Sequence, residues 1–163
     1  VLRKELVQVH QKYASQEEAL RSIAQTFVDL GVVKESFPQA IIDREAVYPT
    51  GLPASEFDIA ISHCDSDHVN ESAIGAVVLD EPVEFEMMGG MGDGPLSVRL
   101  IFMLAIKDPK AQVPTLQKMM AIIQNQQLWM MRERDAIDCF IFMPREYFSK
   151  DLSIGTASHF NVF

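Results

Sequence analysis

The chain has 163 residues, of which 14 are Lys or Arg and 23 are Asp or Glu, so its formal net charge is −9. Nucleic acids and anionic membranes are bound by clustered basic side chains, and this charge argues against both partners. No apolar run reaches the roughly 18 residues that a membrane-spanning helix needs. Two cysteines cannot form a disulfide framework. Residues 1–5 do not resemble a secretion signal, and we expect a cytoplasmic protein.

The first elements are a short strand and a helix. Alternating apolar residues predict a strand over residues 6–10. Ser15 and Glu18 then fit a capping box, in which each residue satisfies a free backbone N–H at the start of a helix. Apolar residues recur at helical spacing after this box, and Gly31 is typical of a helix end.

A second helix is predicted directly after the first. Ser36 and Gln39 fit another capping box, and Pro38 is tolerated in the first helical turn. Pro49 ends this helix because proline disfavours helical geometry at the residue before it. We interpret residues 49–53 as a stiff turn.

The next segment begins as a strand and ends in polar groups. Phe57, Ile59 and Ile61 alternate with polar or small residues, which predicts a strand with one buried face. The alternation stops at His63, and polar or small residues follow it. We therefore expect the imidazole of His63 at a strand end that opens to solvent.

The remaining elements complete one α/β domain. Strands are predicted over residues 73–79, 83–87 and 98–106, the last of them central, with a glycine-rich hairpin connection over 89–94. A helix follows, and we expect its buried face to carry Val113, Leu116, Met120 and Ile123. Interleaved helices and strands predict a mixed β-sheet of about five strands, covered by helices on both faces. We assign this domain to residues 1–145 and a C-terminal extension of unknown role to 146–163.

His63 and Arg44 are the first candidates for chemistry. A neutral imidazole has an unshared electron pair and titrates near neutrality, so it can accept a phosphoryl group and release it. The alternative for His63 is a solvated or capping residue. Arg44 offers a planar fork of donors suited to phosphate, although beside Glu45 it also fits a solvated helix end. Cys64 lies on the opposite strand face from His63, and we expect a small buried residue there.

A metal site is the alternative interpretation of the same segment. His63, Asp65, Asp67 and His68 offer ligands for zinc, which would make the protein a metal-dependent hydrolase. The spacing of the two histidines matches none of the common zinc signatures. We keep the metal-dependent hydrolase as an alternative of another class.

Three motifs in order resemble the signature of enzyme IIA of the bacterial sugar phosphotransferase system, fructose–mannitol type. They are Arg44-Glu45, Pro49-Thr50-Gly51-Leu52 and Ile59-Ala60-Ile61-Ser62-His63. Further matches, at His63-x-Asp65-x-x-His68, Asp108-Pro109 and Gln112-Val113-Pro114, are most similar to the galactitol-specific subtype. The resemblance covers roughly residues 5–145.

The resemblance implies a phosphocarrier. His63 would be the phosphorylated nucleophile, which accepts phosphate from phospho-HPr and passes it to enzyme IIB, with a membrane enzyme IIC downstream. Arg44 would hold the phosphate or orient the ring. Transfer between two ring nitrogens depends on positioning and charge stabilisation, and it needs neither a metal nor a cofactor.

Two positions depart from the family pattern. Ser62 stands where the family usually has proline, and its hydroxyl can bond a phosphate. Lys110 aligns with a second histidine of several members; it can neutralise phosphate but cannot share a proton at neutral pH. Thr50 and His68 are further candidates for supporting roles. A regulatory relay of the same family and a binding module without transfer activity remain alternatives.

Overall fold

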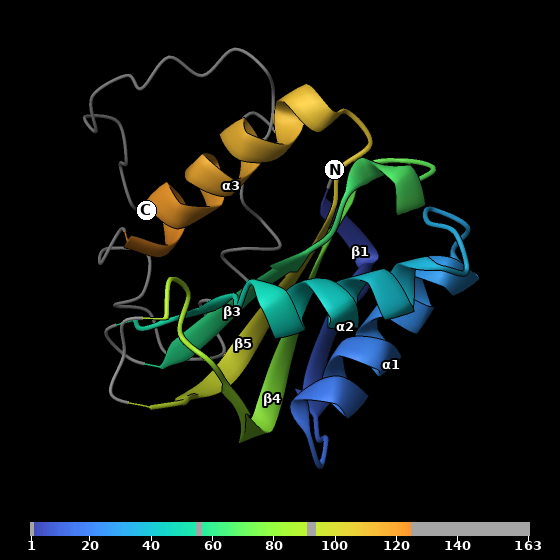
Figure 1. Cartoon of the computed structure of the whole chain (residues 1–163). Helices are drawn as coiled ribbons and strands as arrows, with labels where there is room; N and C mark the ends of the chain where they lie inside the picture. The colour runs from blue at the N-terminus through green and yellow to red at the C-terminus, as the bar shows by residue number, and fades with distance from the viewer. Residues whose placement is uncertain (1, 55–56, 91–93, 125–163) are drawn as a thin grey trace, which may run out of the picture.

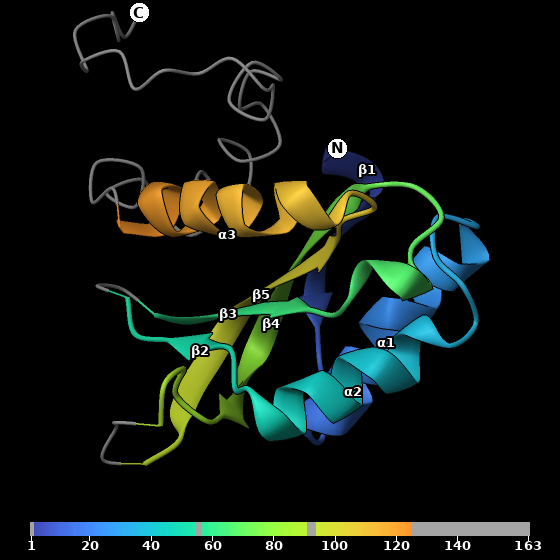
Figure 2. The ribbon, with the colours of Figure 1, turned by 45° about the horizontal axis from the view of Figure 1, so that its top comes forward.

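A mixed β-sheet with helices on both faces organises the structure (Figures 1 and 2). The computed structural model describes residues 2–54, 57–90 and 94–124. Its elements in order are β1 (Leu2–Gln11), α1 (Gln16–Asp29), α2 (Phe37–Val47), β2 (Gly51–Leu52), β3 (Asp58–His63), a 3-10 turn (Ser66–His68), β4 (Ala73–Phe85), β5 (Leu96–Ala105) and α3 (Pro109–Gln124). The predicted α/β class, with a mixed sheet of about five strands, is confirmed.

The five strands lie in the order β1-β4-β5-β3-β2. β1 pairs parallel with β4, and β3 pairs parallel with β5, whereas the β4–β5 and β2–β3 pairs are antiparallel. The most apolar segment therefore forms the central strand β5, as predicted. The segments predicted as separate strands over 73–79 and 83–87 belong instead to one long strand, whose pairing register with β5 shifts between Val78 and Val83.

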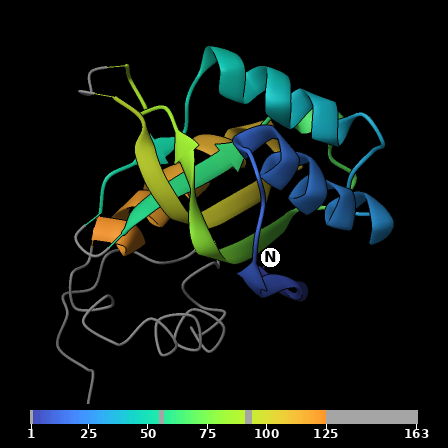
Figure 3. The same cartoon turned by 90° about the horizontal axis from the view of Figure 1, so that it is seen from below.

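The sheet separates two apolar cores. One core lies between the sheet and the α1–α2 layer, and its largest buried side chains include Phe27 and Phe37, whose rings stack at 5.7 Å. The other lies between the sheet and α3, where Ile59, Ile61 and Phe102 pack with Met119. Figure 3 shows the sheet from below, with α1 and α2 gathered at one side of it. Each face of the sheet is thus closed to solvent by helices.

The start of α1 follows the predicted capping box. The Ser15 hydroxyl accepts a hydrogen bond from the Glu18 N–H at 3.2 Å, and the Glu18 carboxylate accepts one from the Ala14 N–H at 2.7 Å. Gly31 follows the helix with a φ of 71°, a left-handed conformation in which glycine has no steric penalty. Local sequence chemistry fixes both ends of this helix.

The capping box predicted for α2 is wrong. Ser36 has helical backbone angles and its side chain caps no N–H of α2. Its hydroxyl instead lies 2.8 Å from Nδ1 of His68, and the Gln39 amide donates to Asp43. Both side chains bond to partners other than the free N–H groups at the helix start. The match of two residues in the sequence was therefore not sufficient to predict capping.

The buried face of α3 is rotated from the predicted one. Ile123 is buried as expected and Leu116 and Met120 are half-buried, but Val113 is 61% exposed. Met119 and Ile122 are the other fully covered positions. The first turn of α3 passes the edge of the site described below, where the Gln112 amide donates to the Cys64 backbone oxygen.

The C-terminal predictions lie outside the described residues. The boundary between a domain over 1–145 and an extension over 146–163 falls beyond residue 124, so it stays a prediction. Within the described ranges, no helix has both the length and the apolar character required to cross a membrane.

Candidate functional site

The candidate site lies at the C-terminal end of β3. This strand runs between β5 and β2, and all its residues after Asp58 are buried. His63 is 9% exposed, so the expected strand end open to solvent is wrong. The half-buried strand is also corrected, because the α1–α2 layer covers the face of Ala60, which we expected to be solvated. The imidazole is therefore held in a mostly closed environment.

The ring of His63 has a defined tautomer. Its Nδ1 lies 3.0 Å from the backbone oxygen of Ile61, two residues earlier on the same strand. A carbonyl oxygen can only accept, so Nδ1 carries the proton and Nε2 keeps the unshared pair. Burial lowers the pKa of His63, an effect that the Ile61 bond opposes and the Arg44 charge reinforces. The ring is thus neutral at pH 7, with Nε2 as its basic atom.

Arg44 approaches the same strand end from the last turn of α2. Its Nη1 lies 3.9 Å from the Asp65 carboxylate, and its guanidinium lies 4.4 Å above the centre of the Tyr48 ring. Its Nε is buried without a hydrogen-bond partner among the described residues. Buried polar atoms are normally paired, so an unpaired buried donor at this place is unusual.

A buried carboxylate lies on the other side of the same helix end. Glu45 is 5% exposed, and its two oxygens accept hydrogen bonds from the Thr50 N–H at 2.8 Å and the Thr50 hydroxyl at 2.7 Å. Burial raises the pKa of Glu45, and the Thr50 bonds partly oppose this. No role was predicted for Glu45 from the sequence, where its only signal is its place in the Arg-Glu motif.

Ser62 joins this buried group and not His63. Its hydroxyl lies 3.4 Å from the Thr50 hydroxyl. Ser62 points to the α1–α2 face, because neighbours on a strand alternate and Ala60 belongs to that core. His63 continues the opposite face with Ile61, which packs in the α3 core. Ser62 and Thr50 therefore lie together on the α1–α2 side of β3, on the opposite face from His63.

The segment after His63 is tied to α3. The Gln112 amide donates to the Cys64 backbone oxygen at 3.0 Å, a contact that sequence reasoning missed. Lys110 has an exposed side chain, and its backbone N–H donates to Asp108 at 3.0 Å. Cys64 is buried, and burial raises the pKa of its thiol to about 12, so the thiol stays protonated. A nucleophilic thiolate is not available there.

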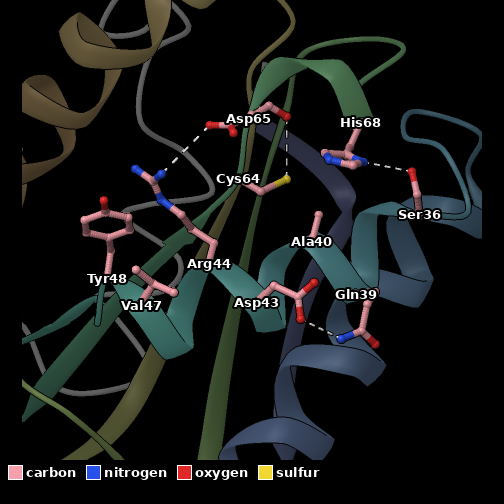
Figure 4. A pocket seen from close by; sticks show the side chains of 10 residues that line it. All are labelled: Ser36, Gln39, Ala40, Asp43, Arg44, Val47, Tyr48, Cys64, Asp65 and His68. Atoms are coloured by element: carbon pink, nitrogen blue, oxygen red, sulfur yellow. Dashed lines mark hydrogen bonds and ion pairs between the residues drawn. The ribbon is translucent and has the colours of Figure 1, made fainter.

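A hollow of about 440 Å³ lies between α2 and the segment after β3 (Figure 4). Arg44 points across it toward Asp65, and the His68 ring turns toward Ser36. The lining residues are Ser36, Gln39, Ala40, Asp43, Arg44, Val47, Tyr48, Cys64, Asp65 and His68. His68 thus belongs to the rim of this hollow, where it is anchored to α2.

The residues of the metal alternative do not converge. In the part of the chain that the structure describes, no three His, Cys, Asp or Glu side chains are grouped to hold a metal ion. His63 binds its own strand through Nδ1, whereas His68 binds Ser36. The donor set at the end of β3 is therefore one buried imidazole with a cationic neighbour.

Comparison with protein families identifies the class of the protein. Residues 1–132 match the family model for the phosphoenolpyruvate-dependent sugar phosphotransferase system, EIIA 2. This match covers more than half of the chain, so the chain belongs to the EIIA 2 family. Enzyme IIA components are phosphotransferases that carry phosphate on a histidine; HPr supplies the phosphate and enzyme IIB receives it.

Three relatives illustrate the family. The galactitol-specific EIIA component of Escherichia coli K12 is 30% identical over 142 residues, which cover 85% of this chain and 88% of that protein. The complex of mannitol enzyme IIA with phosphorylated mannitol enzyme IIB from Escherichia coli aligns with a TM-score of 0.62 at 25% identity, covering 78% and 86%. Nitrogen regulatory protein IIA-Ntr from Neisseria meningitidis, at 18% identity and a TM-score of 0.56 over 83% and 86%, shares the fold.

Proposed function

We propose that His63 is the residue that carries the phosphate, and that Nε2 is the phosphorylated atom. The observation that carries this proposal is the hydrogen bond from Nδ1 of His63 to the Ile61 oxygen at 3.0 Å. It leaves the electron pair on Nε2, and burial keeps the ring neutral by lowering its pKa. A neutral ring with a fixed orientation is prepared to attack a phosphoryl group without first losing a proton.

Arg44 stabilises the transferring phosphoryl group in this proposal. Its Nε has no partner among the described residues, and its contact with Asp65 is loose at 3.9 Å. A guanidinium offers several donors in one plane, which suits the equatorial oxygens of the phosphoryl group. Stacking on Tyr48 restricts the side chain before the partner arrives.

The sugar is a polyol of the galactitol type, and the protein acts in the cytoplasm. The substrate class is supported by the likeness to the galactitol-specific component at 30% identity. The cytoplasm is supported by the phosphate donor, HPr, which this family uses there. Transfer to enzyme IIB distinguishes uptake from the regulatory relay, in which no sugar is imported.

The test is phosphorylation by phosphoenolpyruvate with purified enzyme I and HPr, measured by intact mass. We expect wild type to gain one acid-labile phosphoryl group, and His63→Ala to gain none. His68→Gln is the matched control, because it changes the other histidine of the segment and should keep the phosphate. Arg44→Ala should still accept phosphate but at a rate lower by about 100-fold. A phosphate on His63→Ala would contradict the proposal.

A further inference from the structure

Glu45 is a buried charge that the proposed phosphate transfer does not use. It is 5% exposed, and in the described part of the chain no Lys, Arg or His forms an ion pair with it. Burial of a carboxylate without an opposite charge is unfavourable unless hydrogen bonds replace its water. The structure supplies them from Thr50 and, at 3.4 Å, from the Gln16 amide. A carboxylate buried at this energetic disadvantage is expected to have a structural or functional role.

The reason lies in the pairing of β2 with β3. Gly51 pairs with Ala60 and Leu52 with Ile59, so the antiparallel register brings Thr50 opposite Ile61. Residues opposite each other in a hydrogen-bonded antiparallel pair exchange two bonds, one from each N–H to the other C=O. The first of these is present, since the Ile61 N–H donates to the Thr50 oxygen at 3.2 Å.

The second bond of this pair is diverted. The Thr50 N–H donates to the Glu45 carboxylate at 2.8 Å instead of to the Ile61 oxygen. That oxygen accepts the Nδ1–H of His63 at 3.0 Å. The Thr50 N–H bonds to Glu45 and leaves the Ile61 oxygen to His63. This exchange of hydrogen-bond partners connects the Glu45 carboxylate with the His63 imidazole.

We propose that Glu45 is a positioning residue that sets the tautomer of His63 by withdrawing the Thr50 N–H from the Ile61 carbonyl. The free carbonyl then holds the ring through Nδ1 and leaves Nε2 exposed to reaction. Glu45 also follows Arg44 directly in α2, so the same anchor fixes the helix end from which the guanidinium extends. This inference rests on the proposed role of His63.

Two substitutions of Glu45 separate positioning from charge. In Glu45→Ala the Thr50 N–H is free to complete its pair with Ile61, so the Nδ1–H of His63 loses or shares its acceptor. In Glu45→Gln the amide oxygen can still accept the Thr50 N–H, although the charge is gone. We expect Glu45→Ala to transfer phosphate about 10- to 100-fold more slowly, as small misplacements of a reacting group do, and Glu45→Gln to transfer almost as wild type.

The tautomer is measured directly by nitrogen-15 NMR of the His63 ring at neutral pH, in the unphosphorylated protein. We expect only the Nδ1–H form in wild type and Glu45→Gln, and a mixture with the Nε2–H form in Glu45→Ala. Ile41→Val is the matched control: it weakens the packing of α2 at a buried position one turn before Glu45, leaves the carboxylate in place and should keep the wild-type tautomer. An unchanged ring in Glu45→Ala, or equal losses in both Glu45 variants, would overturn the inference.

Wild type gives a second measurement if Glu45→Ala does not fold. Scalar coupling across hydrogen bonds should connect Nδ1 of His63 with the Ile61 carbonyl carbon, and should not connect the Thr50 nitrogen with it. A coupling from Thr50 would refute the diversion. Neither NMR result depends on phosphate transfer. A wild type that accepts no phosphate would therefore remove the proposed function, while the tautomer would still decide the role of Glu45.

Discussion

Burial moves the pKa values of His63 and Glu45 in opposite directions, and in both cases toward the neutral form. For His63 the shift agrees with its proposed chemistry, because only the neutral ring has a free electron pair. For Glu45 it works against the ionised form, which nevertheless accepts two bonds from Thr50. At the residue scale, the group proposed to position the site is held there at a cost in stability that varies with pH.

This cost predicts how Glu45→Gln changes stability. The folded protein binds the Glu45 proton more tightly than the unfolded chain, whose pKa is near 4.5. Wild type therefore loses stability from this group as the pH rises from 4.5 through the raised pKa. Glu45→Gln has no carboxyl group to titrate. The difference in unfolding free energy between the two proteins should therefore shift in favour of Glu45→Gln as the pH rises across this window.

Urea unfolding of both proteins at several pH values measures this advantage. His63 contributes a slope of opposite sign, since its lowered pKa makes the unfolded chain bind more protons below the ordinary value of 6.5. Both proteins keep His63, so its slope cancels in the difference. Parallel stability curves for the two proteins would show that Glu45 has the same pKa folded and unfolded.

At the element scale, the two-residue strand β2 fixes the position of Thr50, which contacts Glu45 and Ser62. Gly51 donates to the Glu86 oxygen at 3.1 Å and accepts from the Met88 N–H at 2.8 Å, so β2 is bound to β3 on one side and to the segment after β4 on the other. A Cβ atom on Gly51 would lie 2.5 Å from the Glu86 oxygen. This close approach explains why glycine occupies the position next to Thr50.

Gly51→Ala should therefore damage both stability and transfer. We expect its free energy of unfolding to fall by about 1–3 kcal/mol, because backbone has to move to admit the methyl group. The shift displaces Thr50, so phosphorylation of His63 should also slow. The measurements are urea unfolding and the phosphate transfer assay.

Gly90→Ala is the control for the loss of a glycine. Gly90 has a φ of 64° and open space around its Cβ position. Its substitution should lower stability by about 1–2 kcal/mol through backbone strain alone and leave transfer unchanged. A Gly51→Ala protein that transfers phosphate at the wild-type rate would separate β2 from the site.

Periodicity in the sequence was sufficient to predict the longer elements. The capping box at Ser15 and the apolar run of β5 are local patterns, and both appear in the fold. β2 has two residues and no period, so the segment was interpreted as a turn. The face of β3 that continues to His63 is covered by α3, about 50 residues later in the chain, and the place of Thr50 opposite Ile61 depends on the register between β2 and β3. Contacts of this kind have no local signal.

At the scale of the whole molecule, apolar side chains remain exposed around the site. Val47 and Tyr48 are 66% and 59% exposed beside Arg44, and Val113 is exposed on α3, next to the residue that binds Cys64. HPr and enzyme IIB must each bring a side chain to the same histidine. An exposed apolar rim around a nearly buried ring suits small, transient contacts with two different partners.

Val47→Ser should weaken the encounter with phospho-HPr without affecting the ring. We expect KM for phospho-HPr to rise by about tenfold, as when an interface loses an apolar side chain that it buries, with little change in kcat. Val9→Ser is the control, since Val9 is another exposed valine but lies on β1, at the far edge of the sheet. Steady-state transfer kinetics measure both. An equal KM for the two variants would place the docking surface elsewhere.

The bond from Nδ1 of His63 to its own strand also bears on the energy of the phosphate that His63 is proposed to carry. Nδ1 stays protonated throughout, so a phosphoryl group that bonds to Nε2 makes the ring an imidazolium. When the phosphoryl group leaves, the ring becomes a neutral imidazole again without gaining or losing a proton. A neutral ring is a good leaving group, so the phosphate keeps a high transfer potential while it is held. The site can then be loaded and emptied along the same path, and the direction of flow is set by the partners and not by the carrier.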